Sequence, residues 1–188
     1  NIGSKINFGG SDYSEFIPTN LRLGINFMLP IDEYNRFAIA ADANKLLVPT
    51  IPTDDQCRQA LGMGEDEPIS WYNDYRVNNY YNISSIAGIF RSFHDAPGGF
   101  KEELQEINFS VGAEYVYNDR FSLRAGYHHE SENKGNRKYF TVGAGFRMSA
   151  FTLDCGYLIA TAKSNPLDQT LRFSLTFDID GIRDLFRR

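Results

Sequence analysis

The amino-acid sequence predicts an all-β protein, specifically a transmembrane antiparallel β-barrel with a short helix in an extracellular loop. Three observations support this fold class. Apolar and polar residues alternate with period two over most of the 188 residues, the connections alternate in length, and aromatic residues gather at one end of the apolar face. Alternation with this period is typical of strands whose two faces meet different surroundings.

Eight segments show the alternation and are predicted strands. The clearest pair is 104–117 and 121–128, which the break Asn118-Asp119-Arg120 turns into a hairpin. At roughly 3.3 Å per residue and a tilt of ~40°, about 11 residues span ~28 Å, close to the apolar thickness of a bilayer. The segments cover residues 1–8, 20–29, 37–48, 104–117, 121–128, 139–149, 151–162 and 171–179.

Residues 49–103 interrupt the alternation and predict a long loop. Within it, the stretch Ser84–Phe93 has apolar residues at helical spacing, with Ser84 or Ser85 as the cap. The run Asp95–Gly99 is expected to end this helix. Such a long insert among tight hairpins is usually functional or disordered. After the last strand, residues 180–188 read as a polar tail.

Alternation alone does not say whether the apolar face points inward, as in a lipocalin-like soluble barrel, or outward, as in a membrane barrel. The predicted connections fall into two sets at opposite ends of the strands. The short ones are 30–36, 118–120 and 149–150, and the mostly longer ones are 9–19, 49–103, 130–138 and 163–168. Short periplasmic turns with longer outside loops are typical of outer-membrane barrels.

The composition of the two faces also favours a membrane barrel. Aromatic residues at the short-turn end of the apolar face are expected to form an interfacial girdle, namely Phe27, Phe37, Tyr115, Tyr117, Phe121, Phe146, Phe151 and Phe177. The other face carries charges of both signs, which suit a polar lumen better than a lipid-facing surface. These predicted lumen-facing residues are Arg22, Asp42, Glu114, Arg124, Arg147, Asp154, Arg172 and Asp178. They are interpreted as a structural ion-pair network, with solute selection as the alternative.

Composition excludes several function classes. The mean hydropathy of -0.39 and the lack of any apolar run near ~20 residues exclude a helical membrane bundle. A net charge of -5 gives no reason to expect nucleic acid as a partner. No hydrolase, nucleotide-binding or zinc motif occurs, so no catalytic residue, metal or cofactor is predicted. Ser122, His128 and Asp154 lack the order and spacing of a triad, and His128 and His129 read as a hydrated strand end.

The long loop contains the best candidates for binding another protein. Exposed aromatic residues are typical anchors of protein interfaces. The alternative is that they pack within the loop as a lid over the barrel. The predicted partner-binding residues are Trp71, Tyr72, Tyr75, Ile86, Ile89, Phe90 and Phe93.

Several strings resemble a known family. SFHDAPGGFKEELQEI (92–107), VGAEYVYNDRFSLRAGYHHESENKGNRKYFTVGAGFR (111–147) and NPLDQTLRFSLTFDI (165–179) are similar to the PorV/PorQ family of type IX secretion outer-membrane proteins, and residues 17–50 fit the same family. PorV is also called LptO. The resemblance implies a FadL-like barrel of about fourteen strands in the full protein. About eight of them lie here, so residues 1–188 are expected to be the C-terminal part of one barrel domain with its long extracellular loop at 49–103.

The resemblance also implies a function and a location. Family members are multi-pass β-barrels of the cell outer membrane, in contact with its lipid, and they are not enzymes. They bind the SprA/Sov-type translocon, receive secreted cargo through its C-terminal signal domain, and shuttle it to the PorU-type attachment complex. The competing hypothesis is a FadL-type channel for hydrophobic small molecules, which requires an apolar path that the charged lumen residues do not offer. A lipid-modifying enzyme is a third hypothesis, but it needs a nucleophile and a base that the sequence does not reveal.

Overall fold

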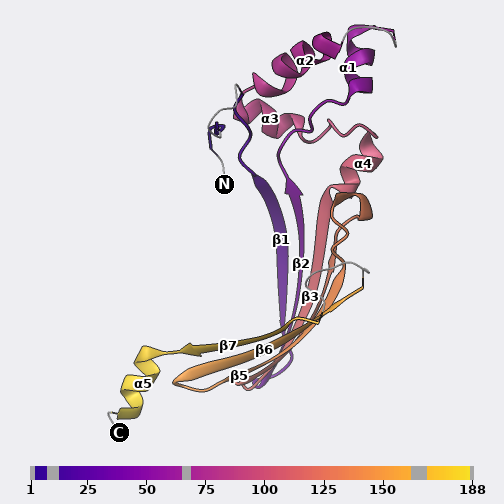
Figure 1. Cartoon of the computed structure of the whole chain (residues 1–188). Helices are drawn as coiled ribbons and strands as arrows, with labels where there is room; N and C mark the ends of the chain where they lie inside the picture. Colours follow the sequence, from indigo (N-terminus) through magenta and orange to yellow (C-terminus); the bar gives the residue numbers. More distant parts are fainter. Residues whose placement is uncertain (1–2, 8–12, 65–68, 162–168, 187–188) are drawn as a thin grey trace. The chain divides into compact units, whose positions relative to one another are not determined.

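A computed structural model of the chain describes residues 3–7, 13–64, 69–161 and 169–186. Its main element is a seven-stranded sheet in which neighbours in sequence are neighbours in space, in the order β1 to β7 (Figure 1). The all-β antiparallel fold class is therefore confirmed, and the sheet is compatible with a barrel wall. The strands are β1 (Asn20–Pro30), β2 (Asn35–Leu46), β3 (Ile107–Tyr117), β4 (Phe121–His129), β5 (Tyr139–Arg147), β6 (Phe151–Ala160) and β7 (Leu171–Phe177).

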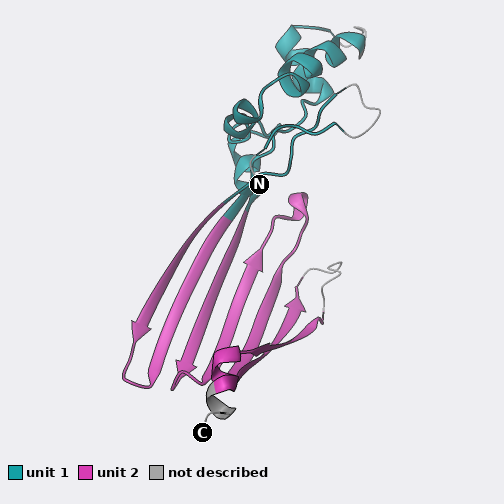
Figure 2. Cartoon of the chain, turned by 90° about the vertical axis from the view of Figure 1, so that its left-hand side faces the viewer, with its two compact units in different colours: residues 1–21, 44–107 teal, residues 22–43, 108–188 magenta. Residues whose placement is uncertain are grey.

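The chain divides into two compact units (Figure 2). Unit 1 comprises Asn1–Leu21 and Asn44–Ile107, and it contains the long loop. Unit 2 comprises Arg22–Ala43 and Asn108–Arg188, and it contains most of the sheet. The units are described separately below, because each has its own chemistry.

Unit 2 is built from hairpins with regular register. Asn118 and Asp119 both have positive φ (50° and 54°), and the Arg120 N–H donates to the Tyr117 carbonyl at 3.0 Å. Positive φ at both central residues is the geometry of a type I′ turn, which matches the right-handed twist of the flanking strands. The turn sets Glu114 opposite Arg124 and Gly112 opposite Gly126. The predicted hairpin is therefore confirmed in place.

The two ends of the chain differ from the predictions. The expected strand at 1–8 is wrong for its described part, where Ile6 forms only an isolated bridge with Glu15. The last strand ends at Phe177 instead of residue 179, and helix α5 (Ile179–Phe186) replaces the expected polar tail. The Asp178 carboxylate explains this change, because it accepts hydrogen bonds from the backbone N–H groups of Asp180 (3.0 Å) and Gly181 (3.2 Å). A side chain that satisfies these orphan donors favours a helix start.

Unit 1 is helical where the sequence predicts one helix in a long loop. Helix α3 (Ser85–Arg91) confirms that prediction, and Ser84 caps it by accepting the Ala87 N–H at 3.2 Å. The other helices were not predicted. They are α1 (Asp54–Leu61), α2 (Ile69–Arg76), the π-helical turn η1 (Val77–Tyr81) and α4 (Phe100–Gln105). A short 3₁₀ turn, η2 (Glu132–Lys134), lies in the β4–β5 loop of unit 2.

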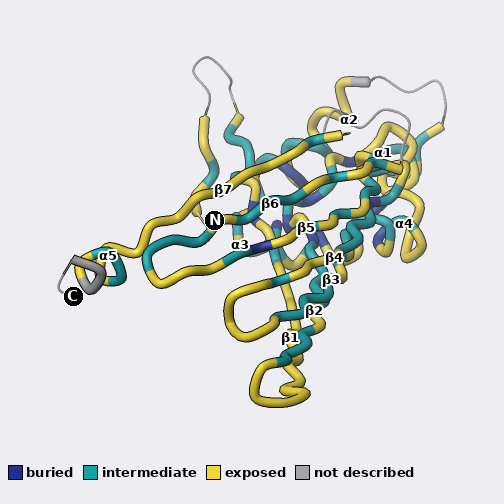
Figure 3. The backbone as a smooth tube through the Cα atoms, turned by 90° about the horizontal axis from the view of Figure 1, so that it is seen from below, coloured by how far each residue is buried: buried dark blue, intermediate teal, exposed yellow. Residues whose placement is uncertain are grey.

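Burial separates the two units. The strands of the sheet are coloured almost entirely as intermediate or exposed in Figure 3. Among the described residues of unit 2, only Glu130 and Gly145 are buried, whereas unit 1 has a small core that includes Leu47, Cys57 and Tyr80. Unit 1 therefore has a small buried core, whereas both faces of the sheet in unit 2 are largely accessible.

Helix α3 is held to the N-terminal segment of unit 1 by a close approach at Gly88. A Cβ at this buried glycine would collide with the Phe16 ring, which also receives the Lys5 ammonium at 4.0 Å from its centroid. We expect Gly88→Ala to destabilise unit 1 by about 1–3 kcal/mol, the usual effect of overpacking. Limited proteolysis would show faster cleavage near residue 16. Gly64→Ala is the control, because a Cβ there meets no atom within 4 Å, and equal cleavage of both variants would contradict the prediction.

Candidate functional site

Helices α1 and α2 form the base of the predicted interaction loop. Thr53 and Gln56 make a capping box at the start of α1, in which the Gln56 N–H donates to Thr53 Oγ1 (3.3 Å) and the Thr53 N–H donates to Gln56 Oε1 (3.0 Å). From the end of α2, Arg76 donates to the Pro52 carbonyl at 2.9 Å and pairs with Asp54. These contacts fix α2 against the start of α1.

The seven predicted partner-binding residues divide into a buried and an exposed group. Tyr72 is only 3% exposed, and its hydroxyl accepts a hydrogen bond from Arg58 Nε at 3.5 Å. Tyr72 is therefore part of the core of unit 1, which corrects its assignment to a binding surface. Tyr75 and Ile89 are half-buried. The remaining four are exposed, namely Trp71, Ile86, Phe90 and Phe93.

Three of these exposed residues share one face of α3 and its continuation. Ile86, Phe90 and Phe93 are spaced by four and three residues, which places them on the same side of a helix. Ile86 is 66% exposed and Phe90 is 68% exposed. We call this set the α3 stripe. An exposed apolar stripe of this kind is typical of a helix that contacts another protein.

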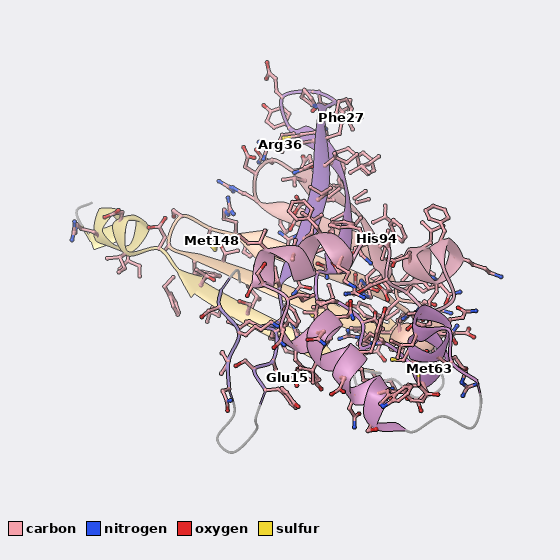
Figure 4. The ribbon with its side chains drawn as sticks, turned by 90° about the horizontal axis from the view of Figure 1, so that it is seen from above. Glu15, Phe27, Arg36, Met63, His94 and Met148 are labelled. Atoms are coloured by element: carbon pink, nitrogen blue, oxygen red, sulfur yellow. The ribbon has the colours of Figure 1, made fainter. Side chains whose placement is uncertain are left out.

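A groove of about 690 Å³ opens beside α3, entirely within unit 1. Its walls include the side chains of Tyr75, Phe90 and Arg91, and its far end is lined by His94 and Asp95. Figure 4 shows His94 just beyond α3. The volume falls within the ~300–1,000 Å³ range of small-ligand sites. The groove therefore has room for a bound chain segment as well as a small molecule.

The neighbouring acidic residues of unit 1 are organised by Lys45. Its ammonium group lies 2.9 Å from Glu103 and 2.6 Å from Glu106, and the Lys45 and Glu103 side chains are each 8% exposed. The Glu103 carboxylate also accepts the Ala96 N–H at 2.8 Å. Burial alone would raise the pKa of Glu103, but the Ala96 and Lys45 hydrogen bonds outweigh it and lower that pKa. Burial raises the pKa of Asp95, whose Oδ2 accepts the Thr50 N–H at 2.7 Å.

On the polar face of unit 2, Arg124 links three strands. Its Nε donates to Glu114 on β3 (2.7 Å) and its Nη1 donates to Asp154 on β6 (2.6 Å). Asp154 lies two strands away, so the Arg124 side chain must pass over β5. Gly145 makes this passage feasible, because a Cβ there would lie 2.6 Å from Asp154 Oδ1 and 3.4 Å from Arg124 Nη1. The absence of a side chain at Gly145 therefore leaves the space in which Arg124 reaches Asp154.

The other predicted lumen-facing residues have more varied places. Arg22 pairs with Asp42 at 3.0 Å across β1 and β2. Arg172 lines a pocket on the same face as Arg124 and Asp154. Arg147 is the last residue of β5. Asp178 lies beyond the end of β7 and caps α5, so it is not a mid-strand charge.

Five of the eight aromatic residues predicted at the short-turn end lie opposite one another on neighbouring strands. Register places Tyr117 opposite Phe121, Phe121 opposite Phe146, and Phe151 opposite Phe177. The ring centroids of Phe121 and Phe146 are 4.9 Å apart, and those of Phe146 and Phe151 are 6.5 Å apart. Phe27 and Arg36, from the β1–β2 hairpin, are labelled in Figure 4. A row of rings therefore crosses neighbouring strands.

Sequence reasoning missed two groups of candidate residues. The first is the two charged residues Arg91 and Asp95, which both line the groove. Their proximity follows from the packing of α3 and has no local sequence signal. The second is Phe100 and Leu104, which are exposed on α4 with i, i+4 spacing. That spacing was readable in the sequence, but it lies where the next strand was expected to begin.

Within the described ranges, no three His, Cys, Asp or Glu side chains are grouped so as to hold a metal ion. None of the described helices combines the length and apolar character that crossing a bilayer requires.

Residues 1–54 match the profile of a known family, described as Type IX secretion system protein PorV. This match includes β1 and β2 and ends at the first residue of α1. No protein of curated function matches the chain. The match supports the resemblance to the PorV family over residues 1–54, under a third of the chain.

Proposed function

From this PorV-family match, we propose that the chain is part of an outer-membrane component of the type IX secretion system that carries cargo. It binds the translocon and the C-terminal signal domain of secreted proteins, and it passes the cargo to the cell-surface attachment complex. The role is one of binding and transfer, without a catalytic step. Unit 1 makes the protein contacts, and the sheet of unit 2 anchors the chain in lipid.

The observation that carries the binding role is the α3 stripe. Burying exposed apolar surface is worth about 25 cal/mol per Å², and aromatic side chains bring the largest areas. Ile86 and Phe90 are mostly exposed in the chain alone, so their apolar area is free to contribute to an interface. Trp71, exposed on α2, adds a residue type that is enriched in interface hot spots.

The anchoring role is supported by the asymmetry of the sheet. Apolar side chains such as Leu123, Val142 and Phe173 are exposed on one face, and Arg124 and its carboxylate partners lie on the other. In water the apolar face would be unstable, whereas in a bilayer it meets hydrocarbon. The row of rings at the short-turn end suits the membrane interface. Together these features support an outer-membrane location.

The polar face argues against a channel for hydrophobic solutes. Such a channel needs a continuous apolar path, but Arg124 spans from β3 to β6 through two ion pairs. A hydrophobic solute that passed there would have to displace charges from their partners, at a large desolvation cost. Protein binding through unit 1 is therefore the better-supported function.

We expect the triple variant Ile86→Ser, Phe90→Ser, Phe93→Ser to abolish co-purification of the translocon and of secreted cargo from mild detergent. The reason is that these substitutions remove the exposed apolar area without touching the core or the sheet. Quantitative mass spectrometry of the purified complex measures the effect. The variant Leu61→Ser is the control, because it removes an exposed apolar residue from α1 of the same unit. Normal capture by the triple variant would refute the assignment of the binding surface.

A further inference from the structure

The groove of unit 1 contains two charged side chains whose hydrogen-bonding capacity is only partly used. Arg91 Nη1 donates to the Asn79 carbonyl, and no described carboxylate lies within salt-bridge distance of this half-buried guanidinium. A guanidinium has five N–H donors, so most of its donors have no protein acceptor among the described residues. Arg91 can therefore donate to a ligand in the groove.

Asp95 lines the same groove, and one of its two carboxylate oxygens has no hydrogen-bond donor in the described part of the chain. Its Oδ2 accepts the Thr50 N–H at 2.7 Å, but its Oδ1 is buried and has no hydrogen-bond partner among the described residues. A buried acceptor without a partner is destabilising, because nothing compensates the loss of its hydration. Such a group in a native protein needs an explanation, and a ligand N–H that completes its hydrogen bonding is one.

The balance of charge in the groove selects the kind of ligand. Arg91 supplies donors and a positive charge, whereas Asp95 supplies an acceptor and a negative charge, and both line the same walls. A purely anionic ligand would meet the Asp95 carboxylate, and a purely cationic one would meet Arg91. A neutral group that carries one donor and one acceptor fits both, and the peptide amide is such a group. The rings of Tyr75 and Phe90 flank the groove and suit an apolar side chain of the same segment.

We propose that this groove binds an extended segment of the secreted cargo through its main-chain amides, with a peptide N–H donating to Asp95 and a peptide carbonyl accepting from Arg91. The inference rests on the proposed function and adds a mode of recognition to it. Main-chain recognition tolerates different sequences, because every residue offers the same amide. A carrier that must accept many cargo proteins gains from that tolerance.

The test uses the full-length protein in detergent and synthetic peptides tiled across the C-terminal signal domain of a secreted protein. We expect one peptide to bind, and a single N-methylation of that peptide to weaken binding at least tenfold. Because successive amides of an extended chain point to opposite sides, only alternate positions should be sensitive. Binding that no N-methylation weakens, or that C-terminal amidation abolishes, would overturn main-chain recognition.

Two variants and one matched control place the site. Asp95→Asn keeps the shape but puts an amide in place of the carboxylate, and Phe90→Ala removes one wall. Each variant should weaken binding of the peptide at least tenfold. Leu61→Ala is the control, because Leu61 is exposed on α1 of the same unit but does not line the groove. Equal loss from Leu61→Ala, or no loss from the other two, would overturn the groove assignment.

The same variants separate this inference from the proposed function. If no peptide binds while cargo still co-purifies with the unchanged protein, the groove inference fails and the proposed function stands. If cargo and translocon never co-purify with the unchanged protein, the proposed function itself fails. Vesicles containing lipopolysaccharide test whether the groove binds lipid instead of peptide. Binding of these vesicles that depends on Arg91 and Asp95, with no peptide binding, would assign the groove to lipid and overturn the inference.

Discussion

Replacing Lys45 by methionine should destabilise unit 1 by about 3–5 kcal/mol, the typical cost of removing one partner of a buried ion pair. Methionine keeps the length of the side chain but leaves Glu103 buried without its cation, and Glu106 loses the same partner. Hydrogen exchange of amides 95–106 in the detergent-solubilised protein measures the loss of local stability.

Lys138→Met provides a matched control for this change. Lys138 pairs with Glu132 at 2.9 Å, but the Glu132 side chain is 74% exposed, so the pair is worth no more than about 1 kcal/mol. If both lysine variants exchanged at the same rate, the cluster around Lys45 would not be the anchor of unit 1.

Acidification should weaken the same cluster. The pKa of Glu103 is lower in the folded chain than in the unfolded chain, where it lies near 4.5. A lowered folded pKa means that the carboxylate stabilises the fold at pH values above the unfolded pKa, and that this stability is lost as the pH falls through the folded pKa. In Lys45→Met the acid-induced loss should be smaller, because the ionised carboxylate no longer has its partner.

Replacing Val142 by arginine should destabilise the sheet in a bilayer by about 2–4 kcal/mol, the cost of a basic residue at the lipid face near mid-depth. Val142 is exposed on the apolar face near the middle of β5. Urea titration of the protein in lipid vesicles measures the change in unfolding free energy.

Thr141→Arg is the control, because its side chain points to the opposite face and lines a pocket of about 470 Å³ beside Arg124. An arginine there extends into polar space and should change stability by less than about 1 kcal/mol. A soluble barrel would give the reverse order, because Val142 would then face the core. The pair of variants therefore tests the orientation of the sheet directly.

The sheet was predictable from sequence because its signal is local and repeated. Except at residues 1–8, period-two alternation located the strands within a few residues, and the break Asn118-Asp119-Arg120 located the β3–β4 turn. The ion pair between Arg124 and Asp154 was not predictable in the same way. Its contact with Asp154 depends on two successive hairpin registers and on the space above Gly145, and none of these can be read from one segment.

Unit 1 was less predictable because its helices are short and irregular. The stretch Trp71–Tyr75 has no clear apolar period. The burial of Tyr72 results from the packing of α2 against α1, which the local sequence does not reveal. Two missed helices did carry local signals. Thr53 with Gln56 is a capping box, Gly62 ends α1 in the left-handed conformation with φ 64°, and Asp178 precedes Ile179 as a cap.

The spacing of the strands along the chain has a consequence for the order of folding. Strands β3 and β4 are separated by three residues, but β2 and β3 are separated by sixty. Closing the longer connection costs about 2.7 kcal/mol more chain entropy than closing the turn, if the insert is unstructured. We therefore expect strands β3 to β7 to pair first. Strand β2 would pair with β3 only after unit 1 has folded and brought Asn44 and Ile107 close. Folding of unit 1 would then promote the pairing of β2 with β3, in addition to providing a binding surface.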